Sequence, residues 1–202
     1  LQNFIKKRPK TKIVCTIGPS SSEVKILKKM ISEGMSVARL NLSHGTIDEH
    51  KKYVSNSRQA AKELSVPIGI LIDIPGPKYR VGKITGGSID LKRGQKIVIG
   101  NETDLNEKAI KLKVWPEGIS KEVGKSKQIF LDDGLIKLSI DSKRGKNIFC
   151  SVLNNANLKS NKSVTIPGSV NKLDYFTNET KEGLKFAKKV NATFVGLSFI
   201  RN

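Results

Sequence analysis

The first third of the chain alternates short apolar runs with longer stretches of mixed polarity. The runs "TKIVCTIG", "MSVARLNL" and "VPIGILIDI", at residues 11–18, 35–42 and 66–74, are rich in hydrophobic side chains, as expected for buried parallel strands. Residues 20–34 and 46–64 lie between them and space their apolar side chains at helical intervals. This alternation of strand and helix predicts a parallel sheet with right-handed crossovers.

Polar residues and glycines indicate where these helices begin and end. The serines at 20–22 are expected to cap the first helix, and Gly34 is expected to stop it. Thr46 is expected to cap the second helix, whose first turn carries acidic side chains that suit the positive end of the helix dipole.

The pattern changes after Gly76. Residues 78–164 contain short runs of alternating polarity separated by glycine and Asx turns, which predicts a β meander or a small barrel. The runs are "KYRVGKI", "SIDL", "QKIVIG", "AIKLKVW", "QIFLDDGLIKLSI" and "NIFCSVL". The earlier pattern then returns, because residues 177–192 predict a helix capped by Thr177 or Asn178, and "TFVGLSFI" at 193–200 predicts another buried strand.

We therefore expect an α/β fold into which an all-β module is inserted. The predicted parts are residues 1–76 as the first part of the scaffold, 77–166 as the insert, and 167–202 as the continuation of the scaffold. Four parallel strands with an open edge make a poor end for a domain, and the sequence does not begin with methionine. We expect the chain to be a piece of a longer protein.

Composition restricts the classes of function. The chain has 37 Lys and Arg against 18 Asp and Glu, a formal net charge of +19, which invites a nucleic-acid interpretation. About half of this excess lies in residues 77–166, no dense basic helix is predicted, and aromatic residues make up 5% of the chain. We interpret the lysines as a solvated surface that can include a pocket for anionic metabolites.

Two further features concern location. No apolar run approaches the roughly 18 residues that a membrane span requires. Cys15 and Cys150 lie far apart and outside any metal-binding spacing, which indicates reduced thiols in a cytoplasmic protein.

Polar side chains follow each predicted parallel strand. The sets are "TIGPSS" after the first strand; Arg39, Asn41, Ser43 and His44 at the second; Asp73, Lys78 and Arg80 after the third; and Ser198 and Arg201 at the last. Because the carboxyl ends of parallel strands meet at one edge, we expect these groups to converge. Arginines suit phosphate and carboxylate, and the oxygens of Asn, Ser and Asp suit hard cations. Taken singly, each arginine also fits a surface ion pair, and His44 fits an ordinary loop residue.

Six motifs, in this order along the chain, resemble the pyruvate kinase family. They are "KTKIVCTIGPSS", "GMSVARLNLSHG", "GPKYRVG", "LDDGLI", "VTIPG" and "FVGLSFIR". Each motif is short, but together they are specific and cover nearly the whole chain. The resemblance implies an α/β fold that is the first half of a (β/α)8 TIM barrel, with residues 77–166 as an inserted β-barrel lid domain.

The resemblance also implies roles for individual residues. Arg39 matches the catalytic arginine that contacts the transferring phosphoryl group, and Asp133 lies in the lid motif. Substrate or nucleotide binding is implied for Arg39, Asn41, His44, Arg80 and Lys162. A monovalent-cation site, or its replacement, is implied for Asn41, Ser43, Asp73, the backbone carbonyl of Ile74, Lys78 and Ser198.

Several positions depart from the common family pattern. Lys78 stands where potassium-dependent members carry a glutamate, and Ile74 and Val81 replace threonines, a combination that resembles the potassium-independent subgroup. We therefore expect the Lys78 ammonium to supply the charge that potassium otherwise brings, with Asp73 paired to it or close to it. K⁺ is then not required. Asn161 stands where the family commonly has a lysine, which leaves one nucleotide contact open.

The reaction implied by the resemblance is phosphoryl transfer from phosphoenolpyruvate to ADP, giving pyruvate and ATP in glycolysis. The family is usually homotetrameric, and Mg²⁺ or Mn²⁺ is the implied cofactor. The divalent-metal ligands and the catalytic lysine are expected beyond Asn202, so the chain alone is expected to be inactive. We expect no membrane or nucleic-acid partner.

Two alternatives remain at this point. One is a catalytically inactive homologue that binds phosphometabolites. The other is a basic nucleic-acid-binding module, which predicts binding to DNA or RNA that falls steeply with salt.

Overall fold

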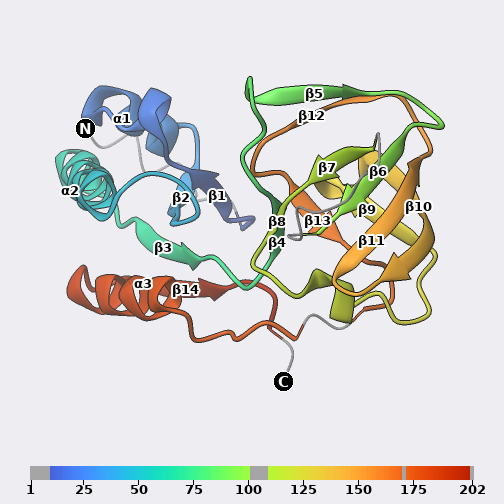
Figure 1. The fold of residues 1–202 in the computed structure, drawn as a ribbon. Coiled ribbons are helices and arrows are strands. Elements are labelled where there is room, and N and C mark those ends of the chain that lie inside the picture. The colour runs from blue at the N-terminus through green and yellow to red at the C-terminus, as the bar shows by residue number, and fades with distance from the viewer. Residues whose placement is uncertain (1–9, 101–108, 170–171, 201–202) are drawn as a thin grey trace. The chain divides into compact units, whose positions relative to one another are not determined.

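The chain divides into two compact units. The computed structural model describes residues 10–100, 109–169 and 172–200. Unit 1 comprises Leu1–Gly76 and Asp174–Asn202, and unit 2 comprises Pro77–Leu173 (Figure 1).

Unit 1 is built on a four-stranded parallel sheet with the strand order β1-β2-β3-β14. The strands are β1 (Ile13–Thr16), β2 (Met35–Asn41), β3 (Gly69–Ile74) and β14 (Phe194–Leu197), and the helices are η2 (Pro19–Ser21), α1 (Val24–Ser32), α2 (Ile47–Glu63) and α3 (Asn178–Lys189). Side chains such as Leu27 of α1, Leu40 of β2 and Phe186 of α3 share one buried core. The predicted α/β fold with a parallel sheet is confirmed.

The predicted ends of the two longer helices are largely confirmed. The hydroxyl of Thr46 accepts from the backbone N–H of Glu49 at 3.3 Å, and the Glu49 carboxylate accepts from the Thr46 N–H at 2.7 Å, which is a capping box at the start of α2. Thr177, rather than Asn178, caps α3, because its hydroxyl accepts from the backbone N–H of Thr180.

The expected serine cap on α1 is wrong. Glu23 occupies the N-cap position and makes no capping hydrogen bond with its side chain. Pro19 begins the short helix η2, and the Ser21 hydroxyl bonds back to Gly18 within that turn. The serines therefore belong to η2, and α1 begins later than expected. Gly34 follows the helix with a φ of 113°, which confirms the predicted stop.

The outer strands of the sheet are more exposed than the apolar sequence indicated. Ile13 and Val14 of β1 are 43% and 51% exposed, and Phe194 and Leu197 of β14 are 52% and 45% exposed. Both strands are edges of the sheet in the described residues, so one side of each has no neighbouring strand. The expectation that both strands are buried is therefore wrong, whereas β2 and β3 place their alternate side chains in the core.

Unit 2 contains only strands and short 3-10 helices among its described residues. The strands are β4 (Tyr79–Val81), β5 (Ser88–Leu91), β6 (Lys96–Ile99), β7 (Ile110–Leu112), β8 (Val114–Trp115), β9 (Gln128–Leu131), β10 (Ile136–Arg144), β11 (Asn147–Val152), β12 (Ala156–Lys159) and β13 (Ser163–Thr165), and the 3-10 helices are η3 (Ile119–Lys121) and η4 (Asp132–Gly134). Eight strands form one sheet in the order β7-β6-β11-β10-β9-β13-β4-β8, and β12 pairs with β5. The inserted all-β module is confirmed.

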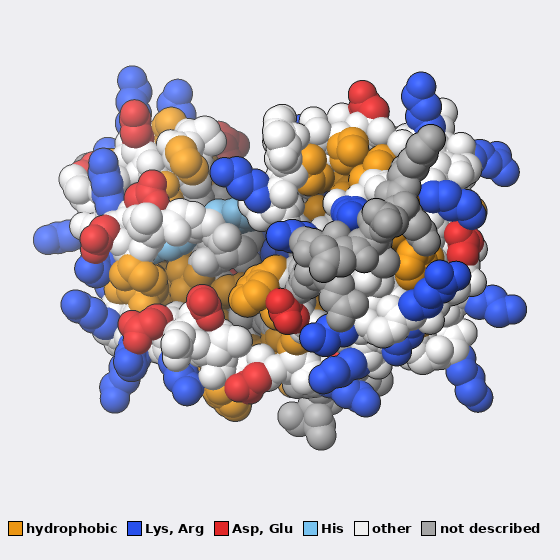
Figure 2. Space-filling view, in the orientation of Figure 1, with side chains coloured by type: hydrophobic (Ala, Val, Ile, Leu, Met, Phe, Trp, Pro, Cys, Tyr) orange, Lys and Arg blue, Asp and Glu red, His pale blue; other side chains and the backbone are white. Residues whose placement is uncertain are grey.

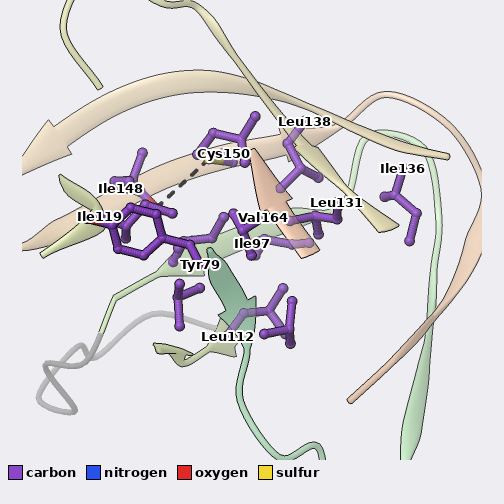
Figure 3. Close-up of a cluster of buried hydrophobic side chains, with 14 of the residues drawn as sticks. Tyr79, Ile97, Leu112, Ile119, Leu131, Ile136, Leu138, Ile148, Cys150 and Val164 are labelled. Carbon is purple, nitrogen blue, oxygen red and sulfur yellow. Dashed lines mark hydrogen bonds between the residues drawn. The ribbon is translucent and has the colours of Figure 1, made fainter. Parts of the chain in front are cut away.

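The alternating runs of unit 2 direct one set of side chains inward. These form a core separate from that of unit 1, including Ile97, Leu131, Leu138, Ile148 and Val164 (Figure 3). The run "QIFLDDGLIKLSI" is divided by η4 into β9 and β10, which pair with each other as a hairpin. The two aspartates of that run, Asp132 and Asp133, lie in η4, which connects the two strands.

A buried glutamate attaches the last segment of unit 2 to its core. The Glu122 carboxylate is 8% exposed and accepts from the Ser169 hydroxyl at 2.9 Å, the Lys172 N–H at 3.1 Å and the Tyr79 hydroxyl at 3.4 Å. Burial, followed by the negative charge of Glu122, raises the pKa of Tyr79 to about 12. These bonds explain why unit 2 extends to Leu173, past the residue 166 boundary expected from the sequence.

Lysine and arginine side chains are spread over the surface of both units. On the face drawn in Figure 2 they are interspersed with acidic and neutral side chains, and they do not gather into one basic patch. This distribution agrees with the solvated surface expected from the sequence.

Candidate active site

Arg39, at the carboxyl end of β2, is the centre of the polar cluster in unit 1. Its Nε lies 3.0 Å from Oδ2 of Asp73, and its Nη2 contacts the same oxygen. Its Nη1 donates to the Thr16 hydroxyl at 2.6 Å. The guanidinium is thus fixed by neighbours on β1 and β3 while about a third of the side chain remains exposed. The planar group retains further N–H donors that suit an anion.

Asp73 joins three strand ends. Its Oδ2 accepts from Arg39, and its Oδ1 accepts from the Ser198 hydroxyl at 3.3 Å. The Ser198 N–H also donates to the Ile74 carbonyl at 3.4 Å. A Cβ atom added to Gly76 would clash with the backbone carbonyl of Ser198, so only glycine fits at position 76 without a shift of the backbone. The predicted convergence at the strand ends of unit 1 is present for these groups.

The loop from Asn41 to Thr46 carries the next set of predicted residues. Oδ1 of Asn41 accepts from the Ser43 N–H at 3.0 Å, and the His44 N–H donates to the Asn41 carbonyl at 3.3 Å. Asn41 is the last residue of β2 and lies two residues after Arg39. The His44 side chain is exposed on the loop. The described contacts of His44 are made by its backbone.

In unit 2, Lys78 and Asp133 form an ion pair. The Lys78 Nζ lies 2.8 Å from Oδ1 of Asp133, which also accepts from the Ser163 hydroxyl at 2.7 Å. The backbone N–H of Asp133 in turn donates to Ser163 at 2.7 Å. The hydrogen bond from Lys78, followed by that from Ser163, lowers the pKa of the Asp133 carboxyl. A pair between Lys78 and Asp73 stays a prediction, since these residues belong to different units.

Arg80 and Lys162 lie beside this pair. Lys162 forms an ion pair with Asp132 at 2.9 Å, and Arg80 donates to the Asn161 carbonyl at 3.1 Å. The strands explain the grouping, because β4 and β13 are antiparallel and place Arg80 opposite Ser163. Lys78, Arg80, Asp133 and Lys162, which were predicted from three separate stretches of sequence, therefore share one edge of unit 2.

Three residues of this edge adopt left-handed backbone conformations. Asp132, Asp133 and Asn161 have φ values of 50°, 53° and 64°. Asp and Asn tolerate this region better than most residues, because their short polar side chains bond locally. The conformation gives a physical reason for asparagine at 161, where the family commonly has a lysine.

Sequence reasoning missed several members of both clusters. Thr16 was predicted only as part of the stretch "TIGPSS" and not as a partner of Arg39, and Ser163 was not singled out, because an isolated hydroxyl residue has no distinctive sequence signal. The hydroxyl of Tyr175 is buried without a hydrogen-bond partner, and burial, followed by the charge of Asp73, raises its pKa. Asp132 could have been found, since it stands next to Asp133 in "LDDGLI".

Arg201 is outside the described residues. Among the described residues, no group of three or more His, Cys, Asp and Glu side chains is arranged to hold a metal ion. A divalent-metal set beyond Asn202 stays a prediction. No helix in the described ranges is long and apolar enough to cross a membrane.

Comparisons with known proteins identify the family of this chain. The family model described as "Pyruvate kinase, barrel domain" matches residues 8–202. A protein named pyruvate kinase from Thermococcus litoralis is 39% identical over 191 residues, which cover 95% of this chain and 40% of that protein. A protein of the same name from Staphylococcus aureus is 38% identical over 195 residues, which cover 95% of this chain and 33% of that protein.

The chain thus spans 40% and 33% of the length of these two relatives. The match to the barrel domain, the parallel α/β sheet of unit 1 and the all-β insert confirm the first part of a (β/α)8 barrel. This chain belongs to the pyruvate kinase family.

Proposed function

We propose that the full-length protein to which this chain belongs transfers a phosphoryl group from phosphoenolpyruvate to ADP, giving pyruvate and ATP. The observation that carries this proposal is the fixed guanidinium of Arg39 at the strand ends of a pyruvate kinase barrel domain. Phosphoryl transfer requires positioned cations more than covalent chemistry, since negative charge must be stabilised on the transferring group.

Arg39 is the catalytic residue that this chain contributes. Asp73 and Thr16 hold the guanidinium, so that it does not have to be oriented when the substrate binds. The free N–H groups of Arg39 then donate to the oxygens of the transferring phosphoryl group. Asn41 and His44, which follow on the same loop, are proposed as substrate and nucleotide contacts.

Unit 2 contributes the proposed lid contacts. Lys78 and Lys162 each form an ion pair with an aspartate and remain charged, whereas the Arg80 guanidinium donates to the neutral backbone carbonyl of Asn161. Arg80 therefore keeps a net positive charge for a nucleotide phosphate. Lys162 adds a second cation on the same edge.

The monovalent-cation site is proposed to be replaced by protein groups. The oxygens that such a site would use already accept hydrogen bonds: Asn41 from Ser43, and Asp73 from Arg39 and Ser198. The Lys78 ammonium supplies a tethered positive charge. K⁺ is then dispensable, which fits the replacement of glutamate by Lys78.

Several finer properties complete the proposal. The reaction takes place in the cytoplasm, in a homotetramer that requires Mg²⁺ or Mn²⁺. The described residues include no group of His, Cys, Asp and Glu side chains that could hold this metal.

The test is an assay of the full-length protein with phosphoenolpyruvate, ADP and a divalent metal, in which pyruvate is measured directly. We expect turnover that depends on both substrates. Substrate binding by calorimetry without pyruvate formation would instead support the inactive homologue. A gel shift with DNA and RNA at two salt concentrations identifies the nucleic-acid alternative, which predicts tight binding that weakens at high salt.

A further inference from the structure

A buried histidine contacts the site loop from behind. His50, in the first turns of α2, is 4% exposed. Its Nε2 lies 2.8 Å from the backbone carbonyl oxygen of His44. A carbonyl oxygen can only accept, so Nε2 carries the hydrogen and donates it.

The other nitrogen of this ring does not stabilise the buried position of His50. Nδ1 of His50 is buried without a hydrogen-bond partner. The ring packs against Tyr53 of its own helix, at 5.7 Å between ring centroids, and against Phe186 of α3, at 6.4 Å. A hydrocarbon side chain would fill this apolar space without burying an unpaired polar atom, which destabilises a fold. The feature that only the histidine provides is its bond to His44.

The bonded carbonyl lies at the middle of the loop between β2 and α2. Asn41 and Ser43 are bonded to each other at the start of this loop, and the capping box of Thr46 fixes its end. The backbone turns at Gly45, whose φ is 76°, and a Cβ atom there would lie 3.6 Å from Nε2 of His50. The loop therefore packs closely against α2 at the point where His50 bonds to it.

We propose that His50 is a positioning residue. Its Nε2–H bond to the His44 carbonyl sets the backbone of residues 41–46, and thereby the positions of Asn41, Ser43 and His44 toward the phosphate groups of the nucleotide. This inference rests on the proposed function for the ligand, but the ordering of the loop by His50 does not depend on it.

The test compares two replacements in the full-length protein. His50→Gln places an amide N–H where Nε2 stands and keeps the donor, whereas His50→Leu fills the space and removes the donor. The matched control is Ser57→Ala, which removes a 2.8 Å bond from a fully buried hydroxyl to Tyr53 on the same helix, away from the loop.

We expect His50→Leu to raise the KM for ADP about tenfold, the effect of losing one well-placed hydrogen bond. His50→Gln should stay within about threefold of the wild type, and Ser57→Ala should lower the melting temperature without changing this KM. Backbone hydrogen exchange of residues 42–46 without ligand should speed up in His50→Leu and not in His50→Gln.

Equal behaviour of His50→Leu and His50→Gln in both measurements would overturn the proposal, because the donor would then be irrelevant. If His50→Leu fails to fold, His50→Asn replaces it, since its shorter amide reaches only the position of Nδ1. A wild type without turnover would contradict only the proposed function, because the hydrogen-exchange measurement still decides whether His50 orders the loop.

Discussion

The Arg39 guanidinium is held by a carboxylate and a hydroxyl from two neighbouring strands, and this geometry requires its planar shape. Lysine at this position would keep the charge but could not bond Asp73 through two nitrogens while also reaching Thr16. In the full-length protein we expect Arg39→Lys to lower kcat by about tenfold or more, if the group stabilises the transition state. Steady-state kinetics with both substrates measure this. A raised KM with an unchanged kcat would show that Arg39 only anchors the ground state.

The ion pair between Lys78 and Asp133 gives the second residue-scale prediction. In the wild type, activity should be nearly the same with and without K⁺ while still requiring a divalent metal. Lys78→Glu would place a carboxylate opposite Asp133, remove the internal cation, and create a need for one from solution. We expect the variant to lose activity without K⁺ and to regain part of it when K⁺ is added.

The control for this prediction is a titration with a large organic cation at equal ionic strength. That cation should not restore the variant, because it does not fit an oxygen-lined site. Strong activation of the wild type by K⁺ would contradict the internal-cation role of Lys78.

Residue identities were predictable where a charged side chain stood in a specific motif. Arg39, Asp73, Lys78 and Arg80 were found in this way, and the structure brings each into a polar cluster. Their partners were harder to find. Ser163 and Thr16 depend on register between strands that are distant in sequence, and no local pattern encodes that register.

At the scale of elements, the carboxyl ends of β3 and β14 meet without room for a side chain. A Cβ atom at Gly76 would overlap the Ser198 carbonyl, so Gly76→Ala must shift one of the two backbones. We expect a loss of stability of about 1–3 kcal/mol, as for other overpacked sites. Urea denaturation of the full-length protein measures it.

The matched control for Gly76→Ala is Gly18→Ala. Gly18 follows β1 in the same unit, has an extended backbone with a φ of −149°, and has nothing within 4 Å of its added Cβ atom. This change should leave stability within about 0.5 kcal/mol of the wild type. Equal effects of both changes would mean that the close approach of β3 and β14 is not a stability constraint.

The sequence predicted which segments form helices and strands better than it predicted which of their side chains are exposed. Hydrophobic spacing and capping residues identified α2 and α3 closely, since both signals are local. The exposure of Val14 and Phe194 could not be read locally, because an apolar strand is buried only if neighbours cover it. The short strand β12 has a mostly polar sequence that does not indicate a strand. It forms by pairing with β5, which is distant in the sequence.

At the scale of the whole chain, each unit has its own hydrophobic core, and the core of unit 2 includes two groups that must stay protonated. The ordinary pKa of Tyr79 is 10.0 and that of Cys150 is 9.0, and both are raised to about 12, in each case first by burial. A pKa raised by folding means that the protonated group stabilises the fold below its unfolded pKa. This contribution is lost as the pH rises toward 12.

We therefore expect the stability of unit 2 to fall between about pH 9 and pH 12. The stability of the Tyr79→Phe variant should fall less steeply with pH from pH 10 upward, because phenylalanine has no proton to lose. Urea midpoints measured at each pH, with a tyrosine-absorbance titration in parallel, test this. A Tyr79→Phe variant with the pH dependence of the wild type would assign the effect to other groups.

The pairing of β4 with β13 has a consequence for the ancestry and engineering of this chain. β4 and β13 run antiparallel, with Tyr79 opposite Val164, so two positions of unit 2 that are 85 residues apart in the chain lie one strand spacing apart. A gene segment with such adjoining ends can be acquired or removed by a single recombination event, because the host needs only an ordinary short turn to rejoin its chain. Because unit 2 has a core separate from that of unit 1, we expect it to be exchangeable for a foreign domain whose ends are similarly spaced.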